Sequence, residues 1–95
     1  ILHNRADVVG NTATVRGGGI YLENNATAFL HGFDTSIGLN FPAASLYPNS
    51  VTNGSGGGIY ADNSTVILSN DARLASNNST EHGGGIYLTN SDVYI

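Results

Sequence analysis

The alternation of hydrophobic and polar residues divides this chain into short strands. Residues 56–82 contain three such runs, which are Ile59-Tyr60-Ala61, Thr65-Val66-Ile67-Leu68 and Ala72-Arg73-Leu74. Each run alternates with a period of two residues and ends near an asparagine, which is the pattern of a half-buried strand. The connections are too short to hold helices. The sequence therefore predicts three strands in this unit and an all-β chain.

One motif, Gly-Gly-Gly-Ile-Tyr, occurs three times. When the chain is shifted so that Ile1 lies over Ile67, its two ends align without a gap. Strands this short can bury their alternate residues if each pairs with its equivalent in the next copy. We therefore expect a right-handed parallel β-helix, a solenoid of about three and a half coils. The repeated motif residues are Gly17, Gly18, Gly19, Ile20, Tyr21, Gly56, Gly57, Gly58, Ile59, Tyr60, Gly83, Gly84, Gly85, Ile86 and Tyr87.

The first unit is longer than the second, and the excess maps to residues 41–55. This stretch contains Pro42, Pro48 and the turn pair Asn53-Gly54. Because proline has no N–H to give to a strand ladder, we expect a loop inserted between strands. Residues 1–95 are predicted to form a single β-helix segment, and the repeat at both ends suggests a piece of a longer solenoid.

The same alternation predicts which side chains face inward. In each motif the isoleucine and the residue two places later are expected inside, with the tyrosine between them outside and stacked on its equivalents. In the other strands the expected inward positions are Thr27, Val66 and Val93; Phe29, Leu68 and Ile95; Ala6 and Ala72; Val8 and Leu74. Asparagines tolerate left-handed backbone and are expected at two turns, one with Asn24, Asn63 and Asn90, the other with Asn11, Asn77 and Asn40.

Composition excludes several classes of protein. The chain has no cysteine, so a disulfide framework and a thiolate metal site are absent. Its net charge is −4 with only three basic residues, which argues against binding to nucleic acid. No hydrophobic run approaches the length of a membrane helix, so direct membrane insertion is not expected. A signal peptide is not recognisable either.

Candidate chemistry is sparse. Glu23 and Asp62 occupy one repeat position, and a carboxylate pair on adjacent coils suits acid–base catalysis or a Ca²⁺ ion. The third copy has Thr89 there, so a solvated pair is the favoured interpretation. His3, His31 and His82 do not share a repeat position, so no metal site and no cofactor are predicted. Five Asn-x-Ser/Thr sequons begin at Asn25, Asn53, Asn63, Asn77 and Asn78.

The glycine motif, preceded by a hydrophobic residue three places before an asparagine (Val8 with Asn11, Leu74 with Asn77), resembles the repeats of chlamydial polymorphic outer membrane proteins. It is also similar to the pectin-lyase-like β-helix repeats of large bacterial surface proteins. This resemblance implies a secreted or autotransported passenger used in adhesion. It implies no shared catalytic residues.

From these observations we expect a structural and adhesive segment of an extracellular, cell-surface bacterial protein, without catalysis. Its expected partners are further coils of its own chain, neighbouring copies end to end, and a host surface or glycan. Two alternatives stay open: a fragment of a carbohydrate-active β-helix enzyme, motivated by Glu23, Asp62 and the tyrosines, and a subunit of an extracellular filament.

Overall fold

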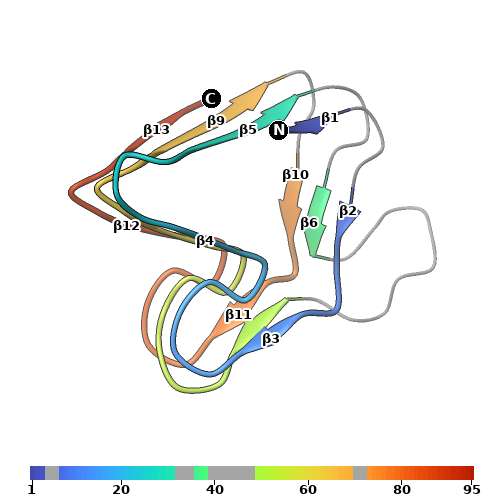
Figure 1. The fold of residues 1–95 in the computed structure, drawn as a ribbon. Helices are drawn as coiled ribbons and strands as arrows, with labels where there is room; N and C mark the ends of the chain where they lie inside the picture. The colour runs from blue at the N-terminus through green and yellow to red at the C-terminus, as the bar shows by residue number, and fades with distance from the viewer. Residues whose placement is uncertain (4–6, 32–35, 39–48, 70–72) are drawn as a thin grey trace.

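The computed structural model describes residues 1–3, 7–31, 36–38, 49–69 and 73–95. Within these residues the chain is all-β, with strands joined by turns and no helix (Figure 1). The strands are β1 (Leu2–His3), β2 (Asp7–Val8), β3 (Thr12–Ala13), β4 (Ile20–Leu22), β5 (Thr27–His31), β6 (Ser36–Gly38), β7 (Ser50–Val51), β8 (Ile59–Asp62), β9 (Thr65–Ser69), β10 (Arg73–Ala75), β11 (Asn78–Ser79), β12 (Ile86–Thr89) and β13 (Asp92–Tyr94).

Each strand from β1 to β9 pairs in parallel with the strand four places later in the chain. The described strands form four sheets, ordered β1-β5-β9-β13, β2-β6-β10, β3-β7-β11 and β4-β8-β12. In Figure 1 equivalent strands and turns of successive repeats therefore lie over one another. The sequence predicted three strands in a repeat, and the fourth was missed because β3, β7 and β11 are two-residue strands rich in polar side chains.

The three glycine motifs stack as predicted. Ile20, Ile59 and Ile86 are partners across β4, β8 and β12. Backbone bonds extend the ladder into the glycines, because the Gly18 N–H donates to the Gly56 carbonyl at 3.1 Å. The first glycine of each motif has positive φ, and a Cβ on the central Gly57 would lie 2.3 Å from a backbone oxygen. Glycine is therefore required at these two places of the motif for different reasons, backbone conformation and close approach.

The next sheet departs from the predicted register by one residue. Ala28 pairs with Val66 and Leu30 with Leu68, so Thr27 and Phe29 are not the inward partners that we expected. Four residues lie between Leu22 and Thr27, whereas three lie between their partners Ala61 and Thr65. Both Asn24 and Asn25 have positive φ in the longer turn. Since side chains alternate across a strand, one added residue exchanges the two faces of β5.

The core lies between these two sheets. The buried cluster consists of Ala28, Leu30, Ile59, Ala61 and Val66. Predicted inward residues Ile20, Leu22, Ile86, Leu88, Val8, Leu68, Leu74 and Val93 pack against it, which confirms those assignments. Ile95, also predicted inward, is 97% exposed. Ala6 and Ala72 lie outside the described residues.

The predicted insertion ends earlier than residue 55. Ser50–Val51 form β7, and Gly54 and Ser55 are buried beside the neighbouring repeats. The extra length lies between Gly38 and Ser50, and its residues 41–48 are outside the described part of the chain. Asn40 is outside it as well, and the place between Asn11 and Asn77 is taken by Asn49.

Asn49 is fully buried, and its side chain links neighbouring repeats. Its Oδ1 accepts bonds from the backbone N–H and the side-chain amide of Asn11, both at 3.0 Å. Its Nδ2 donates to the Val8 carbonyl at 2.7 Å. A buried amide that satisfies both of its ends holds two turns together, which is the structural role predicted for the asparagines at this turn.

Candidate functional site

The motif tyrosines form a column that we call the tyrosine ladder, made of Tyr21, Tyr60 and Tyr87. The rings of Tyr21 and Tyr60 stack with centroids 5.4 Å apart, and those of Tyr60 and Tyr87 with centroids 5.1 Å apart. This arrangement confirms the predicted stacking. Tyr60 is only 9% exposed, because its neighbours cover both of its faces. Tyr60 therefore has no ring face open to a ligand, whereas Tyr21 stacks on one ladder ring only and is 39% exposed.

Arg16 lies on this ladder, which the sequence did not predict. Its guanidinium carbon is 5.3 Å from the Tyr60 ring centroid, within the range of a cation–π contact. Electrostatic interaction with Tyr60, followed by a hydrogen bond with Tyr21, raises the pKa of Arg16 above its usual value. The signal in the sequence was its position, because Arg16 directly precedes the glycine motif and forms a parallel bridge with Ser55 of the next repeat.

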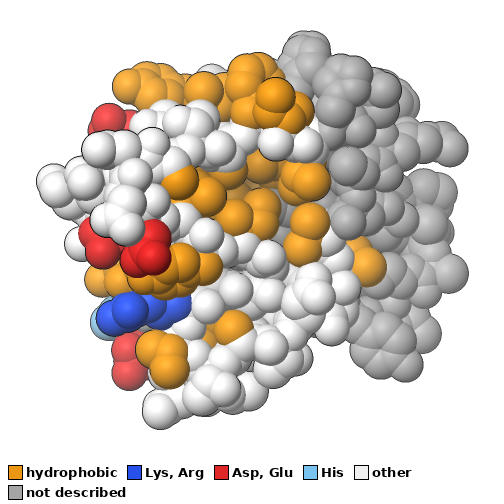
Figure 2. All heavy atoms as spheres, in the orientation of Figure 1, with side chains coloured by type: hydrophobic (Ala, Val, Ile, Leu, Met, Phe, Trp, Pro, Cys, Tyr) orange, Lys and Arg blue, Asp and Glu red, His pale blue; other side chains and the backbone are white. Residues whose placement is uncertain are grey.

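A groove borders the ladder, and we call it the arginine groove. It has a volume of about 250 Å³ and is open to solvent. In Figure 2 blue positive side chains lie between red acidic and orange hydrophobic ones at one side of the molecule. This mixture suits hydrogen bonding to a polar ligand better than burial of an apolar one. The lining residues are Val15, Arg16, Asn53, Gly54, Ser55, Tyr60, Glu81, His82 and Tyr87.

The two candidate carboxylates lie just beyond the backbone pairing of β4 with β8. The pairing of β4 with β8 ends at Leu22 and Ala61, one residue before Glu23 and Asp62. Glu23 is exposed and accepts a hydrogen bond from the Tyr21 hydroxyl at 3.3 Å. Asp62 is half-buried and has Thr89 as its partner in β12. Neither lines the arginine groove, so this groove lacks the facing pair of acids that glycoside hydrolysis requires.

The histidines were predicted to share no repeat position and to form no metal site, and the first of these predictions is wrong. His3 and His31 are partners across β1 and β5, although we expected no shared position. The one-residue shift in β5 explains this, since it moves His31 relative to the sequence repeat. His82 instead stacks on Tyr87 with centroids 6.1 Å apart. In the described part of the chain, no three His, Cys, Asp or Glu residues gather as metal ligands would.

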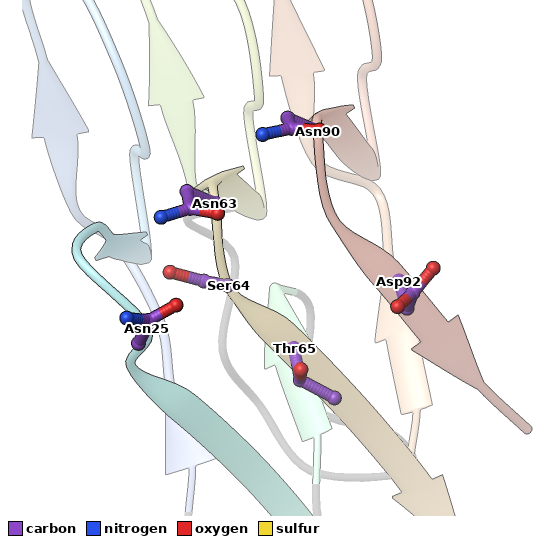
Figure 3. Close-up of a pocket in the computed structure, with 6 residues that line it drawn as sticks. All are labelled: Asn25, Asn63, Ser64, Thr65, Asn90 and Asp92. Carbon is purple, nitrogen blue, oxygen red and sulfur yellow. The ribbon is translucent and has the colours of Figure 1, made fainter.

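A second hollow lies at the turn that follows the motif strands, and we call it the turn pocket. It has a volume of about 300 Å³. Figure 3 shows that asparagines from three successive turns reach it. Asn24, Asn63 and Asn90 all have positive φ, as predicted for this turn. The residues that line the pocket are Asn25, Asn63, Ser64, Thr65, Asn90 and Asp92.

Comparison with family models, with curated proteins and with solved structures found no match for this chain. Among the described residues there is no helix of the length and hydrophobicity needed to cross a membrane. The local geometry described above is therefore the basis for assigning a function.

Proposed function

We propose that this chain is a segment of a right-handed parallel β-helix, wound as a solenoid. The supporting observation is that every described strand from β1 to β9 pairs in parallel with the strand four places later. A chain that winds continuously in one direction produces this order, since each circuit adds one strand to every sheet. The apolar side chains of two neighbouring sheets meet inside, as the wall of a solenoid requires.

The function that this geometry supports best is a structural and adhesive segment of a bacterial cell-surface protein. The register of the glycine motifs carries this proposal. In this register β4, β8 and β12 pair residue by residue, so that the motif tyrosines form a column on the outer side of the sheet. Such a surface suits extended contact, because each added coil repeats the binding elements at a fixed spacing.

Surface display is tested with antibodies raised against the folded segment. Intact cells of the source organism should be labelled without permeabilisation, and brief protease treatment should remove the label. Beads coated with the segment should then adhere to host cells or matrix. Beads coated with the Gly57→Ala variant, in which the added methyl group meets backbone atoms, are the matched control. Labelling confined to permeabilised cells would overturn the proposal.

A catalytic role is tested separately on the full-length protein with a panel of plant, bacterial and host glycans. We expect no turnover. The matched control is the double variant Glu23→Gln, Asp62→Asn, which keeps side-chain volume and removes both charges. Cleavage that disappears in this variant would favour the enzyme alternative. Light scattering of the purified protein tests the filament alternative, because end-to-end assembly would increase with concentration.

A further inference from the structure

The structure distinguishes the five sequons from one another. N-glycosylation needs an asparagine amide and the hydroxyl group two residues later, and both must reach the transferring enzyme. The sequence alone gives all five the same status. Their surroundings in the folded chain differ in the exposure of the asparagine and in the interactions of the hydroxyl group.

Three sequons have a hydroxyl group that the fold already uses or buries. Ser55, which serves Asn53, is only 6% exposed. The Ser79 hydroxyl, which serves Asn77, donates to the His82 carbonyl at 2.9 Å. The Thr80 hydroxyl, which serves Asn78, accepts a bond from the Gly54 N–H at 2.9 Å.

The sequon at Asn63 is held in the middle of the stacked turns. The Asn63 N–H donates to the Thr89 carbonyl at 3.0 Å, and its own carbonyl accepts from the Asn25 N–H at 2.8 Å. Its hydroxyl residue, Thr65, is half-buried in β9. The backbone of this sequon is therefore fixed on both sides, although the Asn63 side chain itself is exposed.

The sequon at Asn25 is different in two ways. Asn25 and Thr27 are both exposed, and no hydrogen bond to another described residue occupies either side chain. The turn carries one residue more than its equivalent, with two successive asparagines in left-handed conformation. Asn25 lines the open turn pocket together with Asn63, Ser64 and Thr65, so the pocket leaves space for a sugar beside either sequon and the exposure of Thr27 makes the difference (Figure 3).

We propose that Asn25 is the N-glycan attachment site of this protein. The donor is an oligosaccharide linked to a polyprenyl diphosphate, and an oligosaccharyltransferase of the cell catalyses the transfer. A bond forms between Asn25 Nδ2 and the anomeric carbon of the first sugar, while the bond from that carbon to the diphosphate oxygen breaks. The amide loses one proton, and the polyprenyl diphosphate leaves.

The test is peptide mapping by mass spectrometry of the full-length protein purified from its own cells. We expect the peptide with Asn25 to carry a glycan and the peptides with Asn53, Asn63, Asn77 and Asn78 to be unmodified. The glycan should be lost in both Asn25→Gln and Thr27→Val, whereas Asn24→Gln, a matched control one residue away, should keep it. Circular dichroism spectra that match the unsubstituted protein exclude misfolding as the cause of the loss.

Three outcomes would overturn the assignment: an unmodified Asn25, equal modification of the buried or bonded sequons, or a glycan that persists in Thr27→Val. The result is independent of adhesion. If Asn25 carries a glycan and the protein does not adhere, this inference holds and the proposed function is wrong. If the protein adheres and Asn25 is unmodified, the proposed function holds and this inference is wrong.

Discussion

Two neighbouring sheets meet at one turn, yet only one of them keeps the spacing of the sequence repeat. In β4, β8 and β12 the motif residues align as they do in the sequence. In β5 and β9 the register is displaced by one residue, because the turn at Asn24 and Asn25 is longer. Identity between copies therefore determines the register of the first sheet, whereas burial of Leu30 and Val66 determines the register of the second.

The largest effect should come from Gly57, in the sheet that follows the repeat. A Cβ there would lie 2.3 Å from the Asn78 carbonyl oxygen and 2.5 Å from that of Gly84. Backbone atoms of two strands cannot yield as side chains do, so Gly57→Ala should lower the free energy of unfolding by about 4 kcal/mol, above the usual cost of overpacking. Chemical denaturation measures this loss.

Gly85→Ala is the matched control, because a Cβ at Gly85 would meet nothing within 4 Å. Its effect should stay below about 1 kcal/mol. Equal losses in the two variants would show that the close approach at Gly57 is not what the first sheet depends on.

The displaced register of the second sheet is tested at Leu30. This side chain is fully buried, so Leu30→Ala should cost about 3 kcal/mol in stability, as large-to-small changes in a core do. Phe29→Ala, one residue earlier on the half-buried outer face, should cost about 1 kcal/mol. If urea titration gave the opposite order, the faces of β5 would be those that the sequence repeat predicted.

The tyrosine ladder should contribute less than the core. Tyr60 stacks on both neighbours and bears Arg16, so Tyr60→Ala should cost about 2 kcal/mol. Tyr21 stacks on one ring and is 39% exposed, so Tyr21→Ala should cost about 1 kcal/mol. A thermal melt in which Tyr60→Ala equals Tyr21→Ala would mean that the second stacking contact adds nothing.

The sequence predicted most of what depends on identity between copies. The stacked motifs, the outward tyrosines and the left-handed asparagines at one turn all follow from positions that recur. The fourth sheet was not predictable in this way, because Thr12, Ser50 and Asn78 share neither identity nor hydrophobicity. The buried amide of Asn49 holds β7 against β3 through its bonds to Asn11 and the Val8 carbonyl, and these contacts are not visible in the sequence.

The surface was harder to predict than the core. Arg16 lies against Tyr60 of the next repeat, and the charge pattern alone carries no sign of that contact. The five sequons likewise differ only through exposure and hydrogen bonding. The repeated sequence thus determined how the motif strands pair. The added turn residue and local contacts determined the surface features, the Arg16 contact and the exposed sequon, from which binding and modification are inferred.

The turn between the two sheets provides a smaller effect. Asn63 has a φ of 50°, a conformation that costs an alanine about 1 kcal/mol, so Asn63→Ala should destabilise the protein by about that amount. Asn63→Gly should change stability by only a few tenths of a kcal/mol, because glycine adopts this conformation without strain. Guanidinium titration of both variants separates a backbone role from a side-chain role, and equal losses would assign the role to the amide.

The smallest change in stability should come from Glu23, which lies at the turn between the two sheets. This residue also bears on the choice between a catalytic and an adhesive function. Glu23 follows the last paired residue of β4, and its contact with Tyr21 is a 3.3 Å hydrogen bond at the surface. Exposed contacts of this kind contribute little, so Glu23→Gln should change stability by less than about 0.5 kcal/mol. An active-site acid held in an unfavourable environment would behave differently, since its removal commonly stabilises a protein while abolishing activity. A gain above about 1 kcal/mol in Glu23→Gln, absent from Asp92→Asn on the neighbouring sheet, would identify Glu23 as such a strained acid and favour catalysis over adhesion.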